Sequence, residues 1–121
     1  MPSVVERRSY GSVRVYWLNR EEAWRRLEEA ARRVVEERPE VKAVVLFGSL
    51  AEGRAVPGSD ADLLLLLRSS DRPWMERPSE YLPYFEGIGL PLDLFCYTEE
   101  EVEQVPLARH ALSRGRRLAG R

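Results

Sequence analysis

Apolar positions along this chain recur with two different periods, one typical of strands and one typical of helices. Short runs rich in β-branched, aromatic and leucine residues predict strands at 12–18, 41–47, 60–68 and 90–97, the first of them at a sheet edge. Apolar residues at helical spacing predict one long helix, which begins at an Asn19 cap and ends before Pro39. Shorter helices are predicted at 79–85, after a Thr98 cap and at 106–113. This order of elements favours an α/β or α+β sheet with helices packed mainly on one face.

The positions between these elements carry turn residues or charges. We expect a helical turn from about Ser49, a turn at 57–59 and a loop at 69–78, and Gly115 should close the last helix. Arginine and glutamate fill the polar positions of the long helix, Arg25 and Arg26 among them. Such a mixed-sign face is typical of solvated surface.

Composition narrows the class of protein. The 121 residues suit one domain, 1–121, and no apolar run is long enough to cross a membrane. The first ten residues are too charged for a signal peptide, and a single cysteine, Cys96, excludes an internal disulfide, so we expect a cytoplasmic protein with a buried thiol. The formal net charge is −1, which gives no strong nucleic-acid signal. The single histidine, His110, is predicted at the surface and excludes a site built on several histidines.

Aspartate is used sparingly and in one pattern. The chain has sixteen glutamates but four aspartates, and three of the four follow a spaced signature. It reads Gly48-Ser49, ten residues, Asp60-Ala61-Asp62, and then Asp93 in the last predicted strand, whereas Asp71 falls in a loop. The short carboxylate arm of aspartate suits a site that holds a hard cation close to the backbone.

The spacing also has a chemical meaning. Alternate strand residues share a face, so Asp60 and Asp62 project together at the start of a buried leucine run. Two adjacent carboxylates repel each other unless a cation such as Mg²⁺ neutralises them. A strand that ends in Gly48-Ser49 before a turn offers backbone N–H groups and a hydroxyl to a phosphate. The plain alternatives are a turn role for Asp60, an outward edge position for Asp93, and a simple helix cap at Gly48-Ser49.

These motifs resemble the minimal nucleotidyltransferases of the DNA polymerase β-like superfamily. The resemblance rests on 46–67 together with Asp93, and it implies a mixed sheet that carries the three aspartates on neighbouring strands. It also implies transfer of AMP from ATP to a hydroxyl, with release of pyrophosphate. Asp60, Asp62 and Asp93 would be catalytic and would hold two Mg²⁺ ions, and Gly48 and Ser49 would bind the nucleotide. One departure is that Glu52 stands where relatives often have arginine, with Arg54 following Gly53.

The acceptor is not specified by these residues. Minimal nucleotidyltransferases commonly pair with a small helical HEPN-type protein, as antitoxins of toxin–antitoxin pairs, and the resemblance implies such a partner or a homo-oligomer. The alternatives are a small-molecule transferase of the aminoglycoside-modifying kind, a non-catalytic partner-binding module, and a structural domain with coincidental motifs. The aromatic segment 74–85 is expected to pack in the core or to form a protein interface, with base stacking as an alternative. If a partner docks, we expect it on this segment or on the stretch 106–117.

Overall fold

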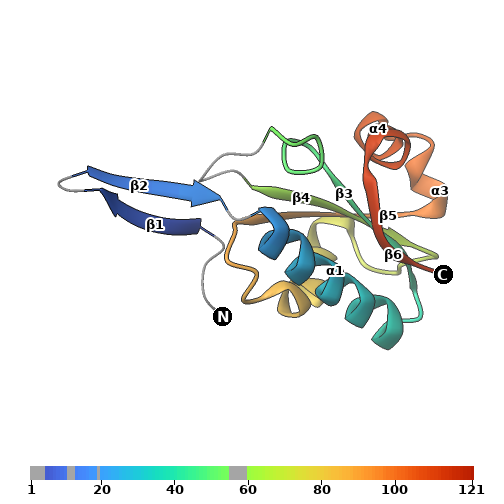
Figure 1. Cartoon of the computed structure of the whole chain (residues 1–121). Coiled ribbons are helices and arrows are strands. Elements are labelled where there is room, and N and C mark those ends of the chain that lie inside the picture. Colours follow the sequence, from blue (N-terminus) through green and yellow to red (C-terminus); the bar gives the residue numbers. More distant parts are fainter. Residues whose placement is uncertain (1–4, 11–12, 19, 55–59) are drawn as a thin grey trace.

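Two separate sheets organise the described part of the chain, which comprises residues 5–10, 13–18, 20–54 and 60–121 of a computed structural model, with side chains from residue 21 onward (Figure 1). One sheet is a hairpin of β1 and β2, which extends away from the rest. The other has the order β5-β4-β3-β6, in which β3 is antiparallel to both neighbours and β4 runs parallel to β5. The predicted mixed sheet is therefore confirmed.

The elements in chain order are β1 Val5–Tyr10, β2 Val13–Leu18, α1 Arg20–Glu37, β3 Val41–Phe47, β4 Ala61–Leu67, η1 Trp74–Glu76, α2 Pro78–Tyr81, η2 Leu82–Phe85, β5 Leu92–Thr98, α3 Glu99–Val102, α4 Pro106–Arg114 and β6 Arg116–Gly120. Every predicted strand is found within two residues of its expected bounds. The Thr98 capping box with Glu101 is also present. Asn19 and the turn at 57–59 lie outside the described residues.

Three differences from the expected elements have physical reasons. The strands β1 and β6 carry adjacent arginines and no apolar run, so backbone pairing rather than local sequence preference forms them. The helix expected at 79–85 is divided into α2 and the 3₁₀ helix η2. Pro83, which lacks a backbone N–H, stands just after this junction.

The larger core lies between the sheet and the long helix. One face of α1 packs on β3, β6 and η2, and apolar side chains of β4 and β5 belong to the same core. Tyr81 and Phe85 are each 2 % exposed, so for these two residues of 74–85 the expectation of core packing is confirmed and that of a docking surface is wrong. The Tyr81 hydroxyl donates to Glu40 Oε2 at 2.8 Å, which satisfies its polar end.

Arg26 departs from the predicted solvated face of the long helix. Its side chain is buried, and Nη1 donates to the carbonyl oxygen of Ile88 at 3.0 Å. Its Nε donates to Glu22 at 2.8 Å, whereas Arg25 is exposed as expected. Arg26 thus ties α1 to the loop that leads into β5.

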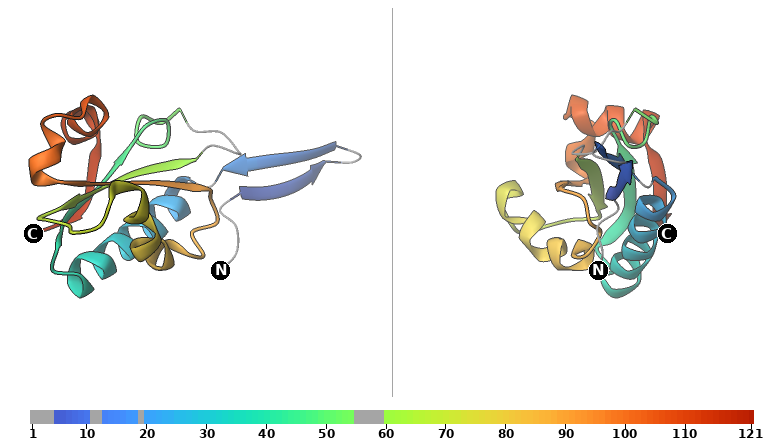
Figure 2. Two further views of the ribbon diagram at one scale, coloured as in Figure 1. Left: turned by 180° about the vertical axis from the view of Figure 1, so that it is seen from behind. Right: turned by 60° about the vertical axis from the view of Figure 1, so that its left-hand side comes forward.

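A smaller core covers the opposite face of the sheet, where α3 and α4 pack (Figure 2). Its buried members come from β3, β4 and the two helices: Val45, Phe47, Leu64, Val102, Ala108 and Ala111. Both faces of the sheet therefore carry helices, with the longer helix and the larger core on one side. Within the described ranges, no helix has both the length and the apolar character needed to cross a bilayer.

Candidate functional site

Two of the predicted site residues stand opposite each other on neighbouring strands. Asp62 of β4 pairs with Asp93 of the parallel strand β5, and on its other side Asp62 pairs with Phe47 of β3. Side chains alternate along a strand, and Leu63 and Leu94 face the α1 core, so Asp62 and Asp93 lie on the face that carries α3 and α4. The two carboxylates therefore share one row and one face of the sheet.

The ends of β4 and β5 are aligned by backbone bonding. The N–H of Ala61 donates to the carbonyl oxygen of Pro91 at 2.9 Å, immediately before the parallel ladder begins. Four leucines of β4 are fully buried: Leu63, Leu64, Leu65 and Leu67. These leucines are buried on both faces of the sheet, and the parallel β4–β5 ladder that they form places Asp62 beside Asp93.

The electrostatics join Asp60 to this pair. Burial raises the pKa of the Asp62 carboxyl, and the negative charges of Asp93 and then Asp60 raise it further. Asp62 is half-buried, whereas Asp60 and Asp93 are exposed. The charges of Asp93 and Asp60 thus disfavour the charged form of Asp62, an effect that a bound cation would relieve.

The donor set fits Mg²⁺, the metal that the resemblance implies. Among the described residues, no three carboxylate, imidazole or thiol groups form a complete metal site by themselves. Mg²⁺ usually takes one or two protein carboxylates and completes its shell with water and substrate phosphates. A half-buried Asp62 next to the exposed Asp60 and Asp93 matches this mode of binding.

Gly48 leaves space at the Asp62 carboxylate. Its φ is +80°, a left-handed conformation that strains other residues, and a Cβ there would lie 3.3 Å from Asp62 Cγ and collide with Oδ2. After Gly48 the chain folds into the expected helical turn, with Glu52 N–H donating to Gly48 O at 3.1 Å and Arg54 N–H donating to Ser49 O at 2.9 Å. The half-buried Ser49 therefore begins a turn directly beside Asp62.

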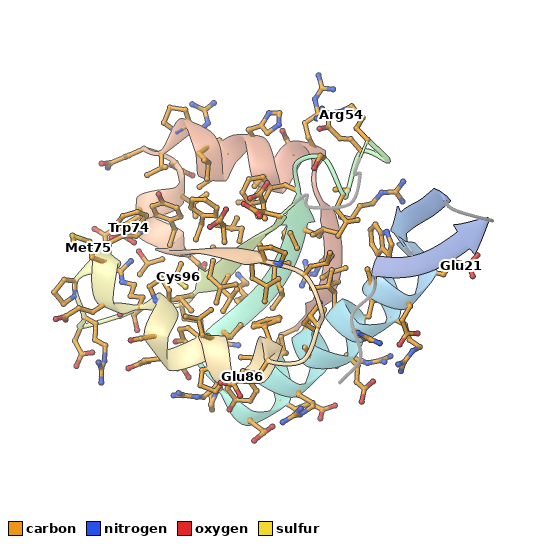
Figure 3. All side chains as sticks on the ribbon, turned by 90° about the vertical axis from the view of Figure 1, so that its left-hand side faces the viewer. Glu21, Arg54, Trp74, Met75, Glu86 and Cys96 are labelled. Carbon is orange, nitrogen blue, oxygen red and sulfur yellow. The ribbon has the colours of Figure 1, made fainter. Side chains whose placement is uncertain are left out.

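Arg54 is held at the outer end of this turn. Its side chain is exposed, and Nη2 donates to Glu52 Oε2 at 2.5 Å (Figure 3). The Arg54 guanidinium also lowers the pKa of Glu52. In this structure the Arg54 charge is therefore engaged by the glutamate that stands in the usual arginine position.

The remaining candidates stand apart from the aspartates. Cys96 is buried on the α1 face, and burial raises the pKa of its thiol to about 12, which confirms an inert core cysteine. His110 is exposed on α4, as expected. The sequence did not indicate that Arg26 anchors the loop that precedes β5 and Asp93. The helical pattern gave no sign that its side chain reaches the Ile88 carbonyl oxygen.

The sequence model of a family described as a nucleotidyltransferase domain matches residues 27–118, more than half of the chain. The chain belongs to the nucleotidyltransferase domain family. This confirms the resemblance seen in the Gly-Ser and Asp-x-Asp motifs, and membership in the family supports a transferase activity.

Solved structures support the fold of this nucleotidyltransferase domain. A proposed nucleotidyltransferase from Sulfolobus solfataricus is similar with a TM-score of 0.65 and 19 % identity, over 84 % of each chain. A toxin–antitoxin structure solved with AMP-PNP is similar with a TM-score of 0.59 and 17 % identity, over 81 % of this chain and 73 % of that one. At these identities the likeness concerns the fold.

Proposed function

We propose that this nucleotidyltransferase transfers AMP from ATP to a hydroxyl group of a protein partner and releases pyrophosphate. The observation that carries the proposal is the cross-strand pair Asp62–Asp93 beside the Gly48-Ser49 turn. Paired carboxylates beside a glycine-serine turn support the proposal, because nucleotidyl transfer needs groups that can hold a metal close to groups that can bind phosphate. Asp60, at the start of the same strand, completes the acidic set.

In the proposed reaction the acceptor oxygen attacks the α-phosphorus of ATP. The bond from that phosphorus to the bridging oxygen of the β-phosphate breaks, and pyrophosphate leaves with the electron pair. Two Mg²⁺ ions, held by Asp60, Asp62 and Asp93, would supply positive charge for the phosphate oxygens. Asp93, which is exposed at the edge strand, accepts the proton of the acceptor hydroxyl. Gly48 and the Ser49 hydroxyl bind the β- and γ-phosphates at the start of the turn.

A small helical HEPN-type protein is the proposed partner. The fold likeness to a toxin–antitoxin structure supports a role for this chain in such a pair, as does the resemblance of its motifs to minimal nucleotidyltransferases. The position of Asp93 on an edge strand is also compatible with a large acceptor, because no strand among the described residues pairs with the outer side of β5.

Labelled ATP tests this function directly. Purified protein with Mg²⁺ and the candidate partner should attach the label of α-³²P-ATP to the partner and release the label of γ-³²P-ATP as pyrophosphate. Transfer of the γ label to the acceptor would show a kinase and contradict the proposal. Efficient labelling of a free aminoglycoside without a protein would favour a small-molecule transferase.

A further inference from the structure

Half of the sheet face that carries Asp62 and Asp93 is left partly uncovered. The helix α4 packs over β3, where Val45 and Phe47 are buried. On β5 the same-face residues Phe95 and Tyr97 are only half-buried, and so is Leu66 on β4. The β4–β5 side of this face therefore exposes apolar surface in the rows next to the carboxylates.

Aromatic side chains make this surface continuous. We name Phe95, Tyr97, Trp74 and Met75 the aromatic strip. Trp74 stacks on Tyr97 with ring centroids 5.7 Å apart and an interplanar angle of 29°. Trp74 is 42 % exposed and the adjacent Met75 is 83 % exposed, and both lie at the same margin of the molecule (Figure 3). Exposed apolar side chains that adjoin one another are typical of an interaction site.

The strip leads directly to the candidate site. Phe95 follows Asp93 by two residues on the same face of β5, a separation of roughly 7 Å along a strand. Phe95 also contacts Phe47 at a centroid distance of 5.6 Å, and Phe47 lies in the same row as Asp62. A chain bound on the strip would therefore extend to the Asp62–Asp93 pair.

Charges around the strip indicate what kind of occupant fits. Exposed carboxylates stand at its ends: Asp93 precedes Phe95, Glu76 follows Met75, and Glu100 and Glu103 come with α3 directly after β5. The nearby Arg77 is buried and donates to Glu101 and to the Cys96 carbonyl oxygen. Arg72 forms an ion pair with Glu80. Arg68, at the end of β4, is a single exposed positive charge against the four carboxylates named above. Such a surface repels a polyanion and attracts a cationic chain.

We propose that the aromatic strip docks the protein acceptor through a short apolar segment flanked by lysine or arginine. This inference rests on the proposed function, since it places the acceptor hydroxyl beside Asp93. Aromatic and methionine side chains supply the central contacts of many protein interfaces, and the acidic surroundings select the charge of the partner. The acidic surroundings also disfavour nucleic acid, which would otherwise stack on Trp74 and Tyr97.

Two synthetic peptides test this surface. Both carry the same leucine and phenylalanine positions and one serine hydroxyl, and they differ only in flanking lysines or flanking glutamates. Fluorescence anisotropy measures their binding to the full chain with Mg²⁺ and a non-hydrolysable ATP analogue. The lysine peptide should bind and the glutamate peptide should not. Trp74→Ala with Met75→Ala should weaken binding at least about tenfold, as expected for loss of central contacts.

Matched variants separate docking from folding and from nucleotide binding. Leu82→Ala removes an equally exposed side chain, 42 %, from η2, and it should leave peptide affinity within about twofold. Met75→Lys alters the most exposed position without removing core, and its positive charge should also weaken binding of the lysine peptide. The affinity for the ATP analogue should be the same in all variants.

The outcomes distinguish the docking surface from the reaction. Equal binding by the double variant, equal binding of the glutamate peptide, or no binding of either peptide overturns the proposed surface. Loss of ATP-analogue affinity in the double variant, with peptide binding intact, would instead make the strip a nucleotide-base platform. Binding at the strip without transfer of the α label would leave the surface in place and contradict the proposed transferase reaction.

Discussion

Asp62 of β4 and Asp93 of β5 lie directly opposite each other on neighbouring parallel strands. Their proximity raises the pKa of Asp62, after the effect of burial, and so stores electrostatic repulsion in the native state. A fold gains nothing in stability from such a pair. The arrangement is explained if the pair serves to bind a cation.

Removing one of these charges should separate activity from stability. We expect Asp62→Asn and Asp93→Asn each to lower nucleotidyl transfer at least about 100-fold, because several kcal/mol of charge stabilisation depend on them. Asp60→Asn should act in the same way. The melting temperature of Asp62→Asn should equal or exceed that of the wild type, since an amide carries no repelled charge. Asp71→Asn, in an exposed loop, is the matched control and should change neither value. Full transfer by Asp62→Asn or Asp93→Asn would contradict their proposed metal-binding role.

Two glycines of one turn allow strain to be separated from crowding. Gly48 and Gly53 both have positive φ, +80° and +74°, but only at Gly48 would a Cβ meet other atoms, those of Asp62. Alanine at either position should cost about 1–2 kcal/mol of unfolding free energy from the left-handed backbone. Gly48→Ala should cost more and should abolish transfer, whereas Gly53→Ala should remain active. Urea unfolding measures the loss of stability, and the labelled-ATP assay measures the transfer. Equal activity in the two variants would argue against a functional need for the close approach of Gly48 to Asp62.

The proposed phosphate contacts of the turn can be ranked by measuring nucleotide affinity. Ser49→Ala should weaken binding of a non-hydrolysable ATP analogue by about 1.5–3 kcal/mol, the value of a hydrogen bond to a charged group. Arg54→Ala should have a smaller effect, because Arg54 is exposed and already bonded to Glu52. Isothermal titration with Mg²⁺ present measures both. A larger loss for Arg54→Ala would move the phosphate site to the outer end of the turn.

The Arg77–Glu101 pair should make stability depend on pH in the acid range. The guanidinium of Arg77 lowers the pKa of Glu101 from 4.5 to about 2. A carboxyl whose folded pKa is depressed stabilises the fold above its unfolded pKa, and this contribution is lost as the pH falls from about 4.5 towards 2. Glu101→Gln should therefore flatten the stability curve in that window. At pH 7 it should cost about 1–3 kcal/mol, because buried Arg77 loses a charged partner, with solvent screening at the half-exposed Glu101 favouring the lower end. Denaturant unfolding at several pH values measures this, and parallel curves for the two proteins would exclude the pair as the cause.

Local sequence was sufficient to predict the strands that carry the candidate site. The apolar runs gave β3, β4 and β5 within two residues, and the spacing from Gly48 to Asp62 indicated the turn and the acidic strand. Two structural relations could not be read from one sequence. The face shared by Asp62 and Asp93 depends on the parallel pairing of β4 with β5, and the burial of Arg26 depends on where the Ile88 carbonyl lies. Both are set by contacts between residues far apart in the chain.

The aromatic strip also could not be predicted from the sequence, because its residues meet only in the folded chain. The sequence left open whether Trp74, Tyr81, Tyr84 and Phe85 pack in the core or form an interface, and in the structure Tyr81 and Phe85 fill the core under α1. Trp74 instead meets Tyr97, which the sequence places in a different element. Helical and strand periods assign residues to faces, but they do not determine which faces remain open.

The parallel pairing of β4 and β5 also has a consequence for the order of folding. Parallel neighbours need a crossover, here the segment from 68 to 91, whereas β3 and β4 pair antiparallel across a shorter loop. Closing the longer loop loses more chain entropy, so the β3–β4 ladder can form at lower entropic cost than the β4–β5 ladder. A nascent chain can therefore build a stable β3–β4 nucleus first, and the repulsion between Asp62 and Asp93 arises only when the crossover closes. The carboxylate pair would then oppose a late docking step rather than the nucleus, and mutations that remove it should leave the early steps of folding unchanged.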